Sequence, residues 1–185
     1  KKIAKLYEEF SEIAHKNKNG WSKQKYFAED IIKPSDKNKY QAFPYNKLHC
    51  TSWNVNQASA IIICNENIAD KLGIPREQRI YPLASSENNH MISLIQRENI
   101  IDPVGLKLAA KYIKDTLTSH RKSIDYYDLY SCFPIAVQMF CDSLNINLSS
   151  STSITGGMSF AGGPLNHYVL SSTTQLIEKM RKKKN

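Results

Sequence analysis

From residue 54 onward, short apolar runs alternate with segments of helical periodicity, and this alternation restricts the fold more than any other feature. Residues 58–64 are mainly apolar and contain three consecutive β-branched isoleucines, with the length and composition of a buried strand. Two more short strands are expected at residues 79–83 and 126–130. Strands that alternate with helices along a chain are typical of α/β layering. The sequence therefore predicts an α/β fold.

The helices are predicted from the spacing of apolar residues and from their start and stop signals. Asn65 is a suitable N-cap and Gly73 a suitable C-terminal stop for one of them. Asp102 and Pro103 form a strong start signal for another. The residues between 20 and 50 are polar, lysine-rich and irregular, so we expect them to pack against another part of the protein. Helices are expected at residues 2–16, 27–32, 65–72, 102–117, 134–144 and 165–183.

The positive charge lies at the two ends of the chain. The net charge is +8, residues 1–40 carry ten lysines against six acidic groups, and residues 178–185 carry five basic groups against one. The segment between them is neutral. Only five of the 25 basic residues are arginine, the preferred side chain for reading bases. Basic ends on a neutral body argue against a nucleic-acid-binding face, and a steep salt dependence of binding would identify that alternative.

No apolar run reaches the roughly 18 residues that a membrane span needs, so we expect no membrane partner. The first residues are typical of a charged amphipathic helix, not a signal peptide, and the absence of an initiating Met suggests a longer parent chain. The four cysteines form no CxxC pair and lack metal-ligand spacing, which predicts no metal site and a reducing, cytoplasmic compartment. They are Cys50, Cys64, Cys132 and Cys141.

Two stretches have the composition of a binding site. In residues 128–134 a predicted strand runs directly into a helix, and open α/β folds bind ligands at that edge of the sheet. The free N–H groups at the start of the helix suit a thioester oxygen or a phosphate. Residues 156–163 contain four glycines and open the last predicted helix, so the backbone there can approach a ligand or a neighbouring segment closely.

Together with their neighbours, these stretches resemble the thiolase superfamily, in its acetyl-CoA acetyltransferase-like branch near the sterol-carrier-protein type thiolases. The most distinctive match is Gly-Gly-x-x-x-x-Gly-Gly-Pro-x-Asn-x-Tyr, a long string of constrained residue types. The matching segments span most of the chain in the family's order, and the resemblance covers the C-terminal portion only. They are residues 42–48, 53–60, 130–134 and 156–168.

The resemblance implies a thiolase-like fold of two similar halves, each with a mixed five-stranded sheet layered with helices. Residues 1–50 would then match the end of the loop region of the first half. Residues 51–78 would supply the last strand and helix of that half, and residues 79–185 an incomplete C-terminal half. On this reading the chain needs a partner, either further copies of itself in a homo-oligomer or its own missing N-terminal part.

The catalytic residues of the family match this sequence poorly. Thiolases use a nucleophilic cysteine near the N-terminus, which this chain does not include. The histidine of the family's Gly-His-Pro motif falls on Gly163, and the asparagine of its Asn-Glu-Ala-Phe loop falls on Tyr130, while Phe133 matches directly. His167 is a weak substitute for the missing base. Cys132, at a predicted helix start, is a weak candidate nucleophile because a helix N-terminus lowers a thiol pKa.

The resemblance therefore implies the C-terminal part of an acyl-CoA acyltransferase that is inactive alone, with a coenzyme A thioester as substrate and no other cofactor. The alternative is a non-catalytic thiolase-like subunit that binds acyl-CoA or partner proteins. In either case we expect Tyr130 and Asn166 to hydrogen-bond the thioester, Phe133 to line the acyl site, and Gly162 and Gly163 to permit close approach. Core packing of Tyr130 and helix capping by Asn166 are the structural alternatives.

Overall fold

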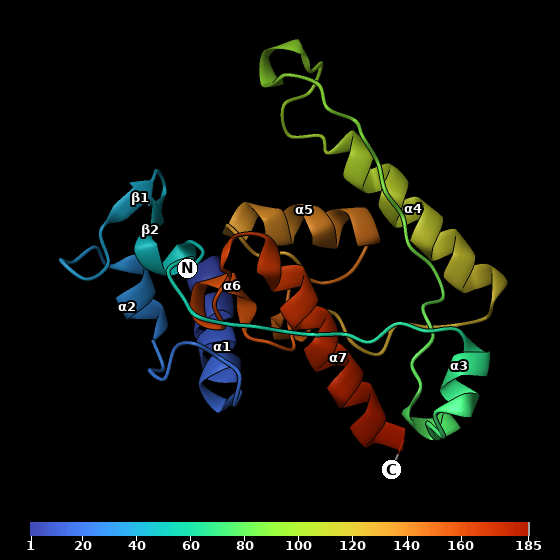
Figure 1. The fold of residues 1–185 in the computed structure, drawn as a ribbon. Helices are drawn as coiled ribbons and strands as arrows, with labels where there is room; N and C mark the ends of the chain where they lie inside the picture. The colour runs from blue at the N-terminus through green and yellow to red at the C-terminus, as the bar shows by residue number, and fades with distance from the viewer. Residues whose placement is uncertain (185) are drawn as a thin grey trace.

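The computed structural model describes residues 1–184, and seven α-helices make up most of its regular structure (Figure 1). They are α1 (Lys2–Lys16), α2 (Ala28–Ile32), α3 (Glu66–Lys71), α4 (Val104–Ser119), α5 (Pro134–Leu144), α6 (Gly157–Phe160) and α7 (Tyr168–Lys184). The 3-10 turns are η1 (Lys47–His49), η2 (Arg76–Gln78), η3 (Leu94–Gln96), η4 (Ser150–Thr152) and η5 (Leu165–His167). The strands β1 (Tyr40–Ala42) and β2 (Tyr45–Asn46) form an antiparallel pair.

The core lies where α1 meets α5 and α6. The apolar face of α1 places Tyr7 and Phe10 in the interior, where the two rings lie 5.6 Å apart. Val137 of α5 and Phe160 of α6 complete this cluster and are fully buried. Burial of one such side chain stabilises the fold by about 1.5–3 kcal/mol. The helical periodicity of the N-terminal segment therefore corresponds to the face that anchors it to the C-terminal third of the chain.

The predicted helices are confirmed, two of them at the same residues. α1 and α5 span the expected 2–16 and 134–144. Asn65 caps α3, since its side chain accepts a hydrogen bond from the amide of Ile68. The last helix begins three residues later than expected, because residues 165–167 form the tighter turn η5 before α7 starts.

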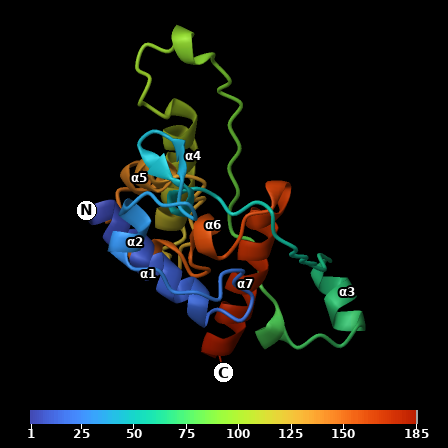
Figure 2. The ribbon, with the colours of Figure 1, turned by 90° about the vertical axis from the view of Figure 1, so that its left-hand side faces the viewer.

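The three predicted strands do not form a sheet. Among residues 1–184, the only hydrogen-bonded sheet is the pair β1–β2, and neither a five-stranded sheet nor a strand at 79–83 or 126–130 is present. Residues 58–64 are also not buried as predicted, since Ile62 and Ile63 are each 89% exposed. A strand is defined by hydrogen bonds to a neighbour. Figures 1 and 2 show why this segment has none: it crosses the molecule as a lone chain that leads to the peripheral α3.

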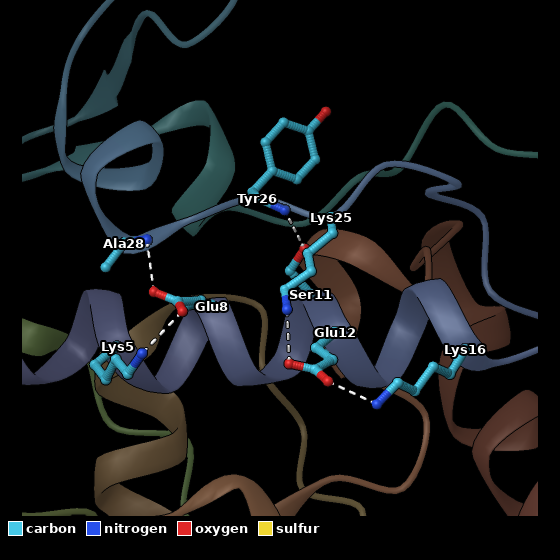
Figure 3. A network of polar contacts seen from close by, with 8 residues as sticks. All are labelled: Lys5, Glu8, Ser11, Glu12, Lys16, Lys25, Tyr26 and Ala28. Carbon is cyan, nitrogen blue, oxygen red and sulfur yellow. Dashed lines mark hydrogen bonds and ion pairs between the residues drawn. The ribbon is translucent and has the colours of Figure 1, made fainter.

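Polar side chains of α1 hold the segment that follows it (Figure 3). The Glu8 carboxylate accepts a hydrogen bond from the amide of Ala28 at 2.9 Å and an ion-pair contact from Lys5 at 2.8 Å. The Ser11 hydroxyl accepts a hydrogen bond from the amide of Tyr26 at 2.8 Å. These bonds satisfy amides at and before the start of α2, which otherwise have no partner within the helix. The irregular segment after α1 thus packs against this helix.

Acid is expected to weaken the packing of the segment after α1 against that helix, and Glu12 is the group responsible. The Glu12 carboxylate accepts hydrogen bonds from Lys16 at 2.6 Å and from Lys25 at 2.9 Å. These two lysines, Lys16 first, lower the pKa of Glu12 from 4.5 to about 2. A carboxyl whose pKa is lower in the folded state stabilises the fold above its unfolded pKa and loses that effect as the pH falls from 4.5 toward 2. We expect Glu12→Gln to be slightly less stable than the wild type in urea near neutral pH and equally stable at the acid end of that range. The exposed Glu87→Gln serves as the control, and a Glu12→Gln difference that persists in acid would contradict the explanation.

Candidate functional site

Asp128 connects the extended segment 126–130 to the glycine-rich turn. Its Oδ1 accepts hydrogen bonds from the Ser153 hydroxyl at 2.7 Å and from the amides of Ile154 and Thr155 at 2.8 and 3.1 Å. The Thr155 hydroxyl donates to the same oxygen at 3.0 Å, and the Tyr168 hydroxyl donates to Oδ2 at 2.8 Å. A single carboxylate therefore holds both the glycine-rich turn and Tyr168, the first residue of α7. Tyr168 in turn lines a pocket beside this network.

A pocket of about 180 Å³ lies beside this network, where residue 130 faces η5 and the start of α7. Tyr130 and Tyr168 meet edge to face, with ring centroids 6.1 Å apart. Burial, and after it the charge of Asp128, raise the pKa of Tyr168 well above its ordinary value, so its hydroxyl stays a neutral donor. The lining residues are Tyr130, Leu165, Asn166, Tyr168 and Val169.

The structure thus brings Tyr130 and Asn166 together at one pocket, as their expected shared role requires. Tyr130 is 39% exposed, so it does not pack in the core. Asn166 lies inside the turn η5, two residues before the final helix α7 begins at Tyr168, and not at the position directly before that helix. Their contact with a ligand stays a prediction. A larger cavity of about 320 Å³ at the start of α4 contains none of the predicted residues.

Gly162 and Gly163 lie outside this pocket lining, against the segment that contains Thr51 and Gln57. Gly162 has a φ of +97°, and a Cβ there would lie 2.9 Å from the Gln57 Oε1. A Cβ on Gly163 would lie 2.8 Å from the Thr51 methyl group. The Gln57 side chain also donates to the carbonyl oxygen of Ala161 at 2.7 Å. These glycines allow two segments of the chain to pack closely, and this contact accounts for them without a ligand.

The remaining predicted residues lie near other partners. Phe133 stacks on Tyr45, with ring centroids 5.7 Å apart. Burial raises the pKa of the Cys132 thiol, although the thiol lies near the start of α5. A raised pKa disfavours the thiolate, which is the nucleophilic form. The ring of His167 lies 3.3 Å from the Ser59 hydroxyl, a partner that sequence reasoning did not find.

Within residues 1–184, no three His, Cys, Asp or Glu side chains gather closely enough to hold a metal ion. In the same part of the chain, no helix combines the length and apolar character needed to cross a membrane.

Comparison with known proteins gives one informative result. No family model matches the sequence, and no curated protein matches it. Among solved structures, the chain is similar to a monomeric SCP2-thiolase-like protein, type 1, from Mycobacterium smegmatis, with 24% sequence identity and a TM-score of 0.79. The match covers 98% of this chain and 40% of that one, so this chain spans less than half the length of that protein. The likeness confirms that these residues have a thiolase-like fold.

Proposed function

We propose that this chain is the C-terminal part of a thiolase-like acyl-CoA acyltransferase of the acetyl-CoA acetyltransferase type, and that it is inactive by itself. The observation that carries the proposal is the shared pocket of Tyr130 and Asn166. The two residues come from separate motifs of the thiolase resemblance, and each can donate a hydrogen bond to a carbonyl oxygen. Tyr168, Leu165 and Val169 offer the mainly apolar walls that a short acyl group needs.

The test is a calorimetric titration of the chain with acetyl-CoA and with acetoacetyl-CoA. Tyr130→Phe and Asn166→Ala should each weaken binding about fivefold, since one net hydrogen bond contributes about 1 kcal/mol. Tyr40→Phe is the matched control, because Tyr40 is an exposed tyrosine of β1 away from the pocket lining. If neither thioester binds, or if all three variants bind like the wild type, the pocket is not the acyl site.

The second candidate function is a non-catalytic thiolase-like subunit that binds acyl-CoA or partner proteins. Glycine at position 163, where the family has its histidine, favours this function because glycine cannot accept a proton. The raised pKa of the Cys132 thiol points in the same direction. Thiolysis of acetoacetyl-CoA by the pure chain should be absent under both functions. Turnover that Cys132→Ser abolishes would contradict both and would make Cys132 the nucleophile.

The finer organisation is also a proposal. Residues 1–50 would be the end of a loop region, residues 51–78 the last strand and helix of a first half, and residues 79–185 an incomplete second half. In that arrangement the extended segments at 58–64, 79–83 and 126–130 belong to mixed five-stranded sheets that other polypeptide segments complete. The four free cysteines support a reducing, cytoplasmic compartment. A role in acyl-CoA and lipid metabolism in that compartment would follow from the proposed function.

A further inference from the structure

Two cysteines that lie far apart in the sequence, Cys50 and Cys132, are brought together by the backbone around them. The amide of Thr51 donates a hydrogen bond to the carbonyl oxygen of Cys132 at 3.2 Å, and the Thr51 hydroxyl donates to the same oxygen at 3.3 Å. Cys50 itself has an extended conformation. Extended chains joined by such a bond run about 5 Å apart. A disulfide spans α-carbon separations of about 4.4–6.8 Å, so the two segments lie at a suitable separation.

One aromatic ring contacts the neighbours of both cysteines. The Tyr45 ring lies 5.9 Å from the ring of His49, the residue before Cys50. It also stacks on the ring of Phe133, the residue after Cys132, at 5.7 Å. The contact between the two segments therefore extends along the chain and is not limited to one hydrogen bond.

The helix α6 holds the same two segments. The carbonyl oxygen of Met158 accepts a hydrogen bond from the amide of Ser52 at 3.0 Å. The amide of Met158 donates a hydrogen bond to the Ser131 hydroxyl at 2.9 Å. Because Met158 and Ser131 are both buried, these bonds fix the position of each segment against the core. A bond between the two cysteines would then need little movement of the backbone.

The two thiols also share a buried neighbour, the hydroxyl of Tyr7. Burial, followed by the charges that Cys132 and then Cys50 carry when ionised, raises the pKa of Tyr7 above its ordinary value. Burial, and after it the charge of Cys132, raises the pKa of the Cys50 thiol as well. Each thiol is thus within electrostatic range of the other. Since burial also raises the pKa of Cys132, both should react slowly at neutral pH and faster as the pH rises.

We propose that Cys50 and Cys132 are a redox-sensitive pair, which a low-molecular-weight disulfide such as oxidised glutathione converts into an intramolecular disulfide. The Cys50 thiolate attacks one sulfur of oxidised glutathione, forms a mixed disulfide and releases one glutathione thiolate. The Cys132 thiolate then attacks the Cys50 sulfur and releases the second glutathione. Two cysteine thiols are oxidised, one glutathione disulfide is reduced, and the two cysteine protons end on the two glutathione products. The inference does not depend on acyl-CoA binding, so each can fail while the other stands.

The test is incubation of the folded chain with oxidised glutathione at mildly alkaline pH, followed by mass spectrometry of its peptides. The expected product is a cross-linked peptide pair that contains Cys50 and Cys132, both of which are half-buried. The exposed Cys64 should instead carry glutathione as a mixed disulfide. In urea, where the fold no longer holds the two segments together, the same treatment should give at least about tenfold less of this cross-link.

The matched variants are Cys132→Ser and Cys64→Ser, and circular dichroism checks that both fold. Cys132→Ser should leave Cys50 as a mixed disulfide with glutathione, whereas Cys64→Ser should retain the full yield of the cross-link. The proposal is overturned if Cys50 and Cys132 of the folded wild type each carry glutathione, or if either pairs with Cys64 or Cys141. It is also overturned if neither cysteine reacts while Cys64 does.

Discussion

Gly156→Ala is expected to destabilise the protein by more than about 4 kcal/mol, a large part of the roughly 5–15 kcal/mol that stabilises an ordinary domain. Gly156 has a φ of +99°, a conformation that disfavours any side chain. Its α-carbon also lies against the backbone of α1, where a Cβ would meet the amide nitrogen of Ala14 and lie 2.6 Å from the carbonyl oxygen of Phe10. Backbone atoms of a helix cannot move aside as the end of a flexible side chain can.

Gly73→Ala is the matched control for this prediction. Gly73 also has a positive φ, +67°, but no atom lies within 4 Å of the position that its Cβ would take. This variant should lose only the stability that a side chain at a positive φ costs, about 1–2 kcal/mol. Urea denaturation of both variants, followed by near-ultraviolet circular dichroism, separates conformational strain from the collision with α1. Equal losses in the two variants would show that the close contact between the turn and α1 contributes nothing.

Local patterns in the sequence predicted the helices well because a helix satisfies its hydrogen bonds within one segment. The apolar residues of 2–16 and of 134–144 each gave the observed bounds. Residues 58–64 are predicted to form a buried strand, whereas they pair with no strand and most of them are exposed. A strand depends on neighbours that its own residues do not specify, so composition alone cannot tell whether they are present.

The pocket was predictable only in part. The thiolase resemblance placed Tyr130 and Asn166 in motifs that meet, and the structure brings them to one pocket. The same reasoning grouped Gly162 and Gly163 with them, whereas their close contacts are with Gln57 and Thr51. Contacts of this kind join residues far apart in the chain and leave no periodic signal.

Asp128 is the clearest residue that sequence reasoning missed. The sequence pattern includes it only as the first residue of the stretch 128–134, in which a predicted strand runs into a helix. A signal was nevertheless present, since six hydroxyl-bearing residues, at 149–153 and 155, precede the glycines at 156 and 157. Side chains of this type commonly bond to a nearby carboxylate or backbone group. What the sequence could not give is the fold that brings residue 128 to them.

Asp128→Ala is expected to lower the free energy of unfolding by about 3 kcal/mol or more. The substitution removes the acceptor for the hydroxyls of Ser153, Thr155 and Tyr168, all of which belong to buried residues. Each buried donor left without a partner costs about 1–3 kcal/mol, and the amides of residues 154 and 155 lose the same acceptor. Because Tyr168 then loses one of the bonds that hold its ring against Tyr130, the proposed acyl-CoA binding should weaken together with stability.

Asp125→Ala is the control that separates a buried acceptor from an ordinary surface carboxylate on the same segment. The Asp125 side chain is 63% exposed and pairs with Lys183 at 3.1 Å, an arrangement worth about 0–1 kcal/mol. Urea denaturation should therefore give a small change for Asp125→Ala and a large one for Asp128→Ala. If the two variants lose equal amounts of unfolding free energy, the Asp128 hydrogen bonds do not stabilise the turn. The shape of the pocket would then depend only on the packing of Tyr130 and Tyr168.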